Sequence, residues 1–254
     1  MTGMMAYSLL SRWSGALGVC AIIAIVRPAH ADPRAVVELF TSQGCSSCPP
    51  ADKILGELAK DPSIIALSMP IDYWDYLGWK DTLADARFSA RQQAYSRVRG
   101  DRDVYTPQVI VNGSAHVVGS DRTAIESAIG TTRGTDGVMS VPVSLTLAGK
   151  QLTVSVAASG NHAAAAHGEV WICSISKAIP ISILRGENGG RELTYYNVVR
   201  NLVKIGDWNG TPGSWNVPLE SVLHEGVDAA AVYVQDGSRE RPGMMLGAAY
   251  ATLH

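Results

Sequence analysis

The sequence is poor in cysteine, in phenylalanine and in excess charge of either sign. Its 254 residues include four cysteines and two phenylalanines, and 21 Lys plus Arg stand against 23 Asp plus Glu. Four cysteines in a chain of this length are too few for a fold held together by disulfides. The net charge of −2 gives no general attraction to nucleic acid, which requires clustered cations. A content of 46% hydrophobic and 17% charged residues is enough for a packed core and excludes wholesale disorder.

Residues 1–31 have the features of a secretory signal peptide. They contain no acidic residue, Arg12 precedes the apolar run 15–26, and residues 29–31 are Ala-His-Ala. The apolar run is shorter than the roughly 20 residues that span a bilayer, and no later stretch is long and apolar enough to do so. We therefore expect cleavage after Ala31 and a secreted or periplasmic protein without a stable membrane anchor. Such a protein meets an oxidising compartment, in which thiols pair or react.

The first part of the mature chain has the pattern of an α/β domain, which we place at 32–130. Apolar runs, helical spacing and turn residues alternate along it. The sequence predicts, in order, a strand over 35–42, a helix over 51–60, a strand over 64–71, a helix over 83–98, a hairpin of strands 109–111 and 115–118 joined by Asn112-Gly113, and a helix that Asp121 caps and that runs to about 129.

The sequence after residue 130 has a different pattern. Residues 131–137 are small and polar, which is typical of a linker. From 138 to 254, stretches of alternating hydrophobicity are separated by glycine-rich or polar turns, and this pattern predicts a mostly antiparallel, sandwich-like β domain without catalytic residues of its own. The glycines of 186–190 are interpreted as a hairpin turn, and 195–205 as a strand or a short helix.

Cys45 and Cys48 form a Cys-x-x-Cys motif, which is either a redox pair or half of a zinc site. No second pair of close Cys or His ligands exists, which argues against structural zinc. The motif lies between a buried strand and a helix start, where amide N–H groups and the helix dipole stabilise a thiolate. We expect Cys45 to be the exposed attacking thiolate and Cys48, one turn into the helix, to resolve the mixed disulfide. The alternative is a static disulfide that closes the helix start, and Cys173 is interpreted as an inert core thiol.

The strand, the Cys-Ser-Ser-Cys motif, the helix and Thr106-Pro107 before the hairpin resemble the thioredoxin superfamily. More narrowly, VVELFTSQGCSSCPPAD together with IDYWDYLGWKD resembles a family of secreted thioredoxin-like proteins of unknown function. The resemblance implies that Pro107 is cis and faces the cysteines, and that Thr106 offers backbone bonds to an extended substrate. It also implies that a buried acid, Glu38, assists proton transfer from the resolving cysteine. The alternative is that Glu38 is hydrogen-bonded to the helix start.

Aromatic side chains gather in the segment after the second strand. Trp74 and Trp79 are candidates for a rim that faces the substrate, together with the tyrosines between and before them. In a thioredoxin-like fold this segment can lie beside the cysteine pair. The alternative is that these rings pack the following helix onto the sheet.

These patterns favour an exported thiol–disulfide oxidoreductase that uses Cys45 and Cys48. Its expected partners are protein or small-molecule thiols and disulfides, and we expect no cofactor and no bound metal. Two other functions stay open. One is a non-enzymatic secreted binding protein with a structural disulfide. The other is a Cu(I)-handling thioredoxin-like protein with the two cysteines as soft ligands and His116 as a candidate third ligand.

Overall fold

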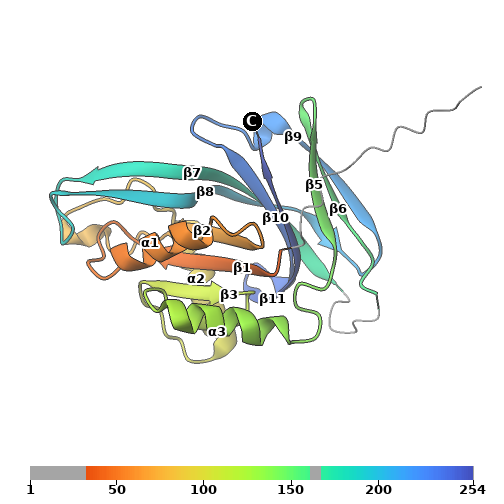
Figure 1. Ribbon diagram of the computed structural model, residues 1–254, viewed down its shortest axis with the longest axis horizontal. Helices are drawn as coiled ribbons and strands as arrows, with labels where there is room; N and C mark the ends of the chain where they lie inside the picture. Colours follow the sequence, from red (N-terminus) through yellow and green to blue (C-terminus); the bar gives the residue numbers. More distant parts are fainter. Residues whose placement is uncertain (1–32, 161–166, 254) are drawn as a thin grey trace, which may run out of the picture. The chain divides into compact units, whose positions relative to one another are not determined.

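Helices and strands alternate in the first half of the chain, and strands make up nearly all of the second half (Figure 1). The computed structural model describes residues 33–160 and 167–253. The first half contains β1 (Ala35–Thr41), α1 (Pro49–Leu58), β2 (Ile64–Pro70), α2 (Ala86–Arg99), β3 (Gln108–Val111), β4 (Ala115–Val118) and α3 (Arg122–Arg133). The second half contains β5 (Val143–Ala148), β6 (Gln151–Val156), β7 (Gly168–Ile183), β8 (Arg191–Trp208), β9 (Gly213–Pro218), β10 (Ala229–Ser238) and β11 (Arg241–Thr252).

The ends of the helices follow from local chemistry. Asp121 precedes α3 and its carboxylate accepts the N–H of Ala124, as predicted, while Asp85 caps α2 in the same way. α1 begins with two prolines, which need no backbone donor at these positions. α2 stops at Gly100, whose φ of +83° is a left-handed conformation that favours glycine.

One eight-stranded sheet runs through both halves of the chain, in the order β11-β10-β7-β8-β2-β1-β3-β4. β1 pairs in parallel with β2 and antiparallel with β3. β8 joins the edge of β2 in parallel, with Ser68 opposite Val198. The remaining neighbours in the sheet are antiparallel. β5, β6 and β9 form a separate antiparallel sheet of three strands.

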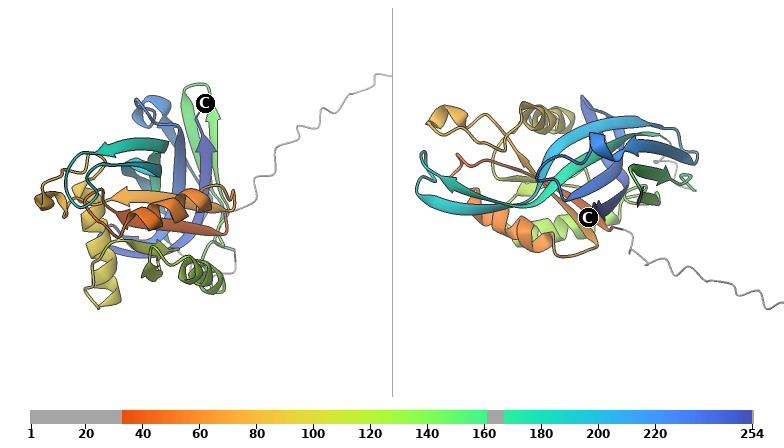
Figure 2. Two further views of the ribbon diagram at one scale, coloured as in Figure 1. Left: turned by 60° about the vertical axis from the view of Figure 1, so that its left-hand side comes forward. Right: turned by 90° about the horizontal axis from the view of Figure 1, so that it is seen from above.

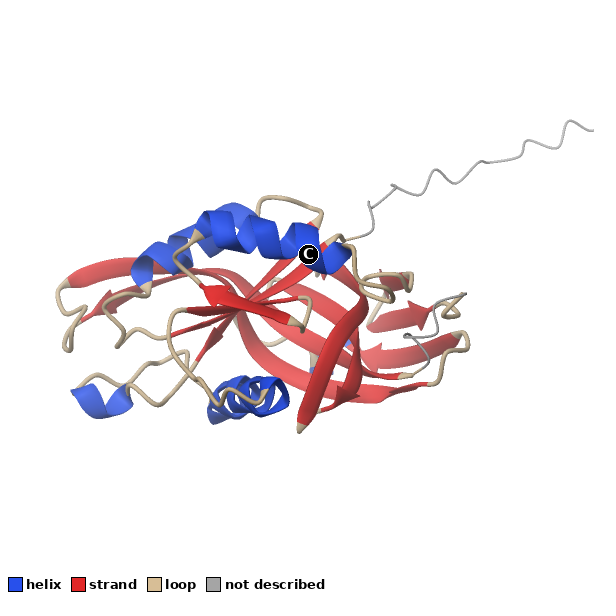
Figure 3. Ribbon diagram, turned by 90° about the horizontal axis from the view of Figure 1, so that it is seen from below, coloured by secondary structure: helices blue, strands red, loops and turns tan. Residues whose placement is uncertain are grey.

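Helices cover both faces of the sheet around β1 (Figure 3). Because side chains alternate along a strand, β1 contributes to two cores. On one face Leu39 packs in a cluster with Leu55 of α1 and Ile125 of α3. On the other face Phe40 packs in a cluster with Phe88 of α2. The small sheet covers the far part of the large one in a third, mostly aliphatic core that also contains Trp208.

The long hairpin of β7 and β8 reaches back over the first half of the chain (Figure 2). Its tip, residues 184–190, lies beside the segment that follows β2, where a Cβ on Gly186 would be 3.2 Å from the Cβ of Trp79. The glycines of the tip form the predicted hairpin turn. Residues 195–205 are strand, which decides between the two alternatives left by the sequence.

The two parts expected from the sequence share one sheet. The described residues, 33–160 and 167–253, belong to a single compact unit. The strands after residue 138 are antiparallel to one another, as expected, but β8 also extends the sheet of the first part. The expected linker at 131–137 begins inside α3, which continues to Arg133 because Thr132 is buried and its hydroxyl bonds back to the carbonyl of Ala128.

Residues 1–31, interpreted as a signal peptide, lie outside the described residues. In the ranges 33–160 and 167–253, no helix combines the length and the apolar character needed to cross a bilayer.

α1 approaches β8 closely because glycine stands at the contact. A Cβ on Gly56 would lie 2.4 Å from Cδ2 and 2.7 Å from Cε2 of the Tyr196 ring. Gly56 is buried, so the helix could make room for a larger side chain at this position only by moving away from β8 and losing packing. The contact therefore fixes the helix that follows the cysteines against β8.

We predict that Gly56→Ala lowers the free energy of unfolding by about 1–3 kcal/mol, because overpacking against Tyr196 outweighs the better helix propensity of alanine. Gly130→Ala in α3 is the matched control, since its new Cβ would meet no atom within 4 Å. The control should raise the free energy of unfolding by about 0.5–1 kcal/mol. Chemical denaturation measures both, and equal stabilisation of both variants would contradict the tight α1–β8 contact.

Candidate functional site

Cys45 and Cys48 form a disulfide between the end of β1 and the start of α1. Their Cα atoms are 5.4 Å apart, and the N–H of Cys48 donates to the carbonyl of Cys45. Cys48 is the N-cap residue of α1, with helical φ and ψ angles, and is not one turn inside the helix as expected. The helix begins immediately after it because Pro49 and Pro50 are suited to the first helical positions.

The disulfide is more deeply covered than the sequence predicts. Cys45 is 3% exposed and Cys48 is 0% exposed, whereas Ser46 and Ser47 between them are exposed. The expectation of an exposed Cys45 is therefore wrong for the disulfide form. Parts of the chain that are distant in sequence pack over residues 42–48, which join β1 to α1 and are called the cysteine loop below. Cys48 is the more deeply buried of the two.

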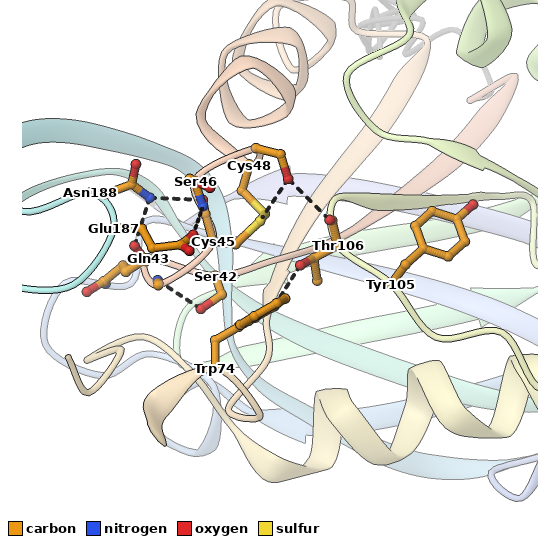
Figure 4. Close-up of a disulfide and its surroundings, with 12 residues drawn as sticks. Ser42, Gln43, Cys45, Ser46, Cys48, Trp74, Tyr105, Thr106, Glu187 and Asn188 are labelled. Carbon is orange, nitrogen blue, oxygen red and sulfur yellow. Dashed lines mark hydrogen bonds between the residues drawn. A yellow bond between two sulfur atoms is a disulfide. The ribbon is translucent and has the colours of Figure 1, made fainter. Parts of the chain in front are cut away.

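The tip of the β7–β8 hairpin supplies part of this cover (Figure 4). The Nδ2 atom of Asn188 donates to the carbonyl of Gln43 over 3.0 Å and to that of Cys45 over 2.9 Å. The Oδ1 atom of Asn188 accepts from Arg191, and the carboxylate of Glu187 accepts the N–H of Ser46 over 3.1 Å. Sequence reasoning missed these residues, since no local signal relates position 188 to position 45.

The aromatic segment after β2 lies on another side of the cysteine loop. The indole N–H of Trp74 donates to Oγ1 of Thr106 over 2.8 Å, and that of Trp79 donates to Oε1 of Gln43 over 2.8 Å. A Cβ on Gly44 would lie 3.1 Å from the Cβ of Trp74. The segment therefore contacts the motif, and both indoles are half-buried and hydrogen-bonded to its surroundings.

Thr106 and Pro107 complete the site from a third element, the loop before β3. Their peptide bond is cis, as expected. The hydroxyl of Ser47 donates to the carbonyl of Thr106 over 3.4 Å, so this backbone borders the cysteine loop (Figure 4). Pro107 is buried, and a Cβ on Gly119 would touch both Pro107 and Ala51 of α1. The structure thus brings the expected Thr106 and Pro107 to the motif.

Glu38 has a different set of partners from either expected one. Its side chain is fully buried and forms an ion pair with Arg91 of α2, with 2.7 Å between Oε1 and Nε. Its Oε2 accepts the hydroxyl of Tyr95 over 2.6 Å. Both partners belong to α2, on the sheet face opposite α1. The assignment of Glu38 to proton transfer at the cysteines is therefore not supported, and it does not bond the start of α1.

Asp52 is the buried acid next to Cys48. Its N–H donates to the carbonyl of Cys48 over 3.1 Å, so the two side chains stand one turn apart on the same face of α1. Neither carboxylate oxygen makes a well-formed hydrogen bond among the described residues, but the hydroxyl of Thr41 in β1 lies close enough to lower the pKa of Asp52. Burial raises the pKa of Asp52 to about 8, and the charge of Asp81 adds to the rise. The spacing of four residues in CSSCPPAD could have pointed to Asp52, but its isolation in the core could not be read from the sequence.

Asp81, which follows the aromatic segment, is hydrogen-bonded to the cysteine loop. Its carboxylate accepts the N–H groups of Gln43 and Leu83, each over 2.8 Å. Burial raises the pKa of Asp81 to about 6 against the effect of these two bonds. Asp52 and Asp81 therefore form a buried acidic pair beneath the loop, in which ionisation of one disfavours ionisation of the other.

Other groups singled out by the sequence are not part of this site. Cys173 is a free, buried thiol in β7, and burial raises its pKa far above the ordinary value, as an inert core thiol requires. His116 contacts Tyr105 and, over 3.7 Å, Asp101. Within the described ranges, no group of three or more His, Cys, Asp or Glu side chains could hold a metal ion.

We predict that Asp52→Asn makes the oxidised protein more stable relative to the wild type as the pH rises. An acid whose pKa is raised by folding binds more protons in the folded state, so its contribution to stability falls as pH rises between about 4 and 8. The variant has no ionisable group at this position and so does not lose stability in this way. The unfolding free energy of the variant minus that of the wild type should therefore grow by on the order of 3 kcal/mol between about pH 4 and pH 7. Denaturant titrations across this range measure it. A difference that does not change with pH would contradict the buried, protonated Asp52.

Comparison with known proteins places the chain in a family. A family model described as a protein of unknown function, DUF1223, matches residues 36–235. No curated protein matches significantly. HBP35 of Porphyromonas gingivalis aligns over 87% of this chain and 76% of its own with a TM-score of 0.55, and at 14% identity this likeness concerns the fold alone. The crystal structure of a protein from Agrobacterium tumefaciens is 32% identical, with a TM-score of 0.77 over 87% of this chain and 95% of its own. Since the family model spans most of its length, this chain belongs to the DUF1223 family.

Proposed function

We propose that this protein is an exported thiol–disulfide oxidoreductase whose first part, residues 32–130, has a thioredoxin-like organisation. The observation that carries the proposal is the meeting of three elements at one point. A Cys-x-x-Cys disulfide lies at the start of α1, and Thr106-Pro107 borders it. The helix packs against the part of the sheet in which the strands have the order β2-β1-β3-β4. Helices on both faces of this four-stranded part are consistent with the same organisation. The strands after 138 then form an accessory part that also reaches the site.

The proposed reaction is exchange between two thiols and one disulfide. In the reduced protein, the Cys45 thiolate attacks a sulfur of the partner disulfide, the partner S–S bond breaks, and one partner sulfur leaves as a thiolate. The Cys48 sulfur then attacks Cys45, which restores the internal disulfide and releases the second partner sulfur. Two electrons pass to the partner, whose sulfurs take up two protons. Cys45 is the first nucleophile because Cys48 is completely buried.

A pKa of about 8 leaves a minor fraction of Asp52 ionised near neutral pH, and this fraction is suited to receive the proton that Cys48 loses in the second step. This pKa lies close to the ordinary thiol value of about 8.5, so a proton can pass between the two groups with little loss of free energy. Asp52 also stands one helical turn from Cys48. In this proposal Asp52 takes the role that the sequence suggested for Glu38.

The partner is proposed to bind along Thr106 and the aromatic segment. Trp74 holds the side chain of Thr106 through its indole N–H, and it stacks on Tyr76 with ring centroids 6.3 Å apart. Tyr76 is 77% exposed, so this stack offers an apolar face beside the disulfide. The partners are proteins or small molecules that carry thiols or disulfides, and residues 1–31 would direct the protein to the compartment in which they occur.

A second candidate function is that of a secreted binding protein in which the disulfide is structural. The observation that favours it is the deep burial of both cysteines, 3% and 0% exposed, beneath the hairpin tip. A disulfide that no partner can reach stabilises the loop without taking part in exchange.

The two functions differ in the response to substitution of one cysteine. We predict that Cys48→Ala traps a mixed disulfide between Cys45 and a disulfide substrate such as insulin, because no thiol remains to resolve it. Cys45→Ala should abolish exchange without trapping the substrate. Non-reducing gels and the rate of insulin reduction measure these outcomes.

Cys173→Ala serves as the control, since the thiol is buried and outside the site, and it should leave exchange nearly unchanged. If Cys48→Ala traps no substrate and neither cysteine of the reduced protein reacts with iodoacetamide in the native state, the disulfide is structural and the oxidoreductase function is excluded.

A further inference from the structure

The tip of the β7–β8 hairpin places a carboxylate against the cysteine loop. Asn188 is 1% exposed and fixes the tip by donating to the carbonyls of Gln43 and Cys45. The neighbouring Glu187 is exposed, and its Oε2 accepts the N–H of Ser46 over 3.1 Å (Figure 4). Ser46 directly follows Cys45, so a negative charge is held beside the first cysteine by a segment more than 140 residues further along the chain.

We propose that Glu187 disfavours the thiolate form of Cys45 and thereby biases the cysteine pair towards the disulfide. This inference rests on the proposed function and concerns the same site. Two physical effects act in the same direction. The carboxylate repels a thiolate at the neighbouring residue, and it also occupies the N–H of Ser46, which would otherwise be free to stabilise that thiolate.

Other charged groups near the loop modify this effect but do not replace it. Arg191 at the start of β8 donates to Oδ1 of Asn188 over 2.8 Å, and its positive charge opposes that of Glu187. Asp52 of α1 and Asp81 of the segment before α2 are buried and add negative charge when they ionise. Among the described residues, Glu187 is the charged side chain that bonds the backbone of the Cys45–Cys48 loop itself.

The bias sets the direction of electron flow. A less stable thiolate raises the free energy of the reduced pair, so the reduced protein gives up its two electrons more readily. Its substrates are then disulfides: Cys45 and Cys48 become the internal disulfide, and the partner disulfide becomes two thiols that take up the two protons. A dithiol of a partner protein is the class of reductant that regenerates the pair.

The test is the pH profile of Cys45 alkylation in the reduced protein, with iodoacetamide as the probe and mass spectrometry of the peptide that contains Cys45. Glu187→Gln keeps the size of the side chain and removes the charge. We expect Cys45 of this variant to react about three- to tenfold faster at about pH 6, with the whole profile shifted to lower pH, because the repulsion of one unit charge at short range through partly aqueous surroundings has this magnitude. The difference should shrink at high salt, which screens an exposed charge.

Glu192→Gln is the matched control, since Glu192 is an exposed acid of the same hairpin that lies outside the loop contact. It should leave the profile unchanged. Identical profiles for the wild type and Glu187→Gln would overturn the inference, as would equal shifts in both variants, which would mean a general effect of net charge. If Glu187→Gln shifts the profile while Cys48→Ala traps no substrate, the effect of Glu187 on the thiolate is supported and the proposed oxidoreductase function fails.

Discussion

The buried amide of Asn188 joins the β-rich half of the chain to the cysteine loop, and the architecture of the site depends on it. It donates to two carbonyls of the loop, those of Gln43 and Cys45, and accepts from Arg191, so its bonding capacity is used almost fully. Removal of this side chain would take the donor from the buried carbonyl of Gln43, at a cost of about 1–3 kcal/mol, whereas the carbonyl of Cys45 would keep the N–H of Cys48. The position of Glu187 and part of the cover over the disulfide follow from this contact.

The hairpin can reach the loop because the sheet is continuous. β8 adds to the edge of β2, and the hydrogen bonds of Asn188 hold the tip of the hairpin at the start of α1. A second contact between the two halves of the chain lies on the sheet face that α2 covers. There Arg91 of α2 donates to both Glu38 of β1 and Gln235 of β10. Breaking such a buried pair from one side typically costs about 3–5 kcal/mol, so Glu38 serves to hold the two halves together rather than to exchange protons with the cysteines.

The sequence was sufficient for features that depend on neighbours along the chain. Strand alternation, the cap at Asp121 and the motif of Cys45 and Cys48 are local, and the predicted order of elements up to α3 agrees with the structure. The expectations that differ involve residues far apart. Nothing near Glu38 in sequence indicates Arg91, 53 residues away, and nothing near Cys45 indicates Asn188, 143 residues away. Hydrophobic patterns predict that a side chain is buried, but they do not identify the polar group that it meets there.

The reduction potential of the Cys45–Cys48 pair tests the central claim most directly, because it separates a disulfide that exchanges from one that is only structural. Equilibration of the protein with redox buffers of known potential, followed by quantification of both cysteines, gives this value. We expect a potential above about −300 mV, within the range of exchanging thioredoxin-like pairs and towards its reducing end. A potential far below about −300 mV would contradict it and would identify the disulfide as a structural bond beneath the hairpin tip.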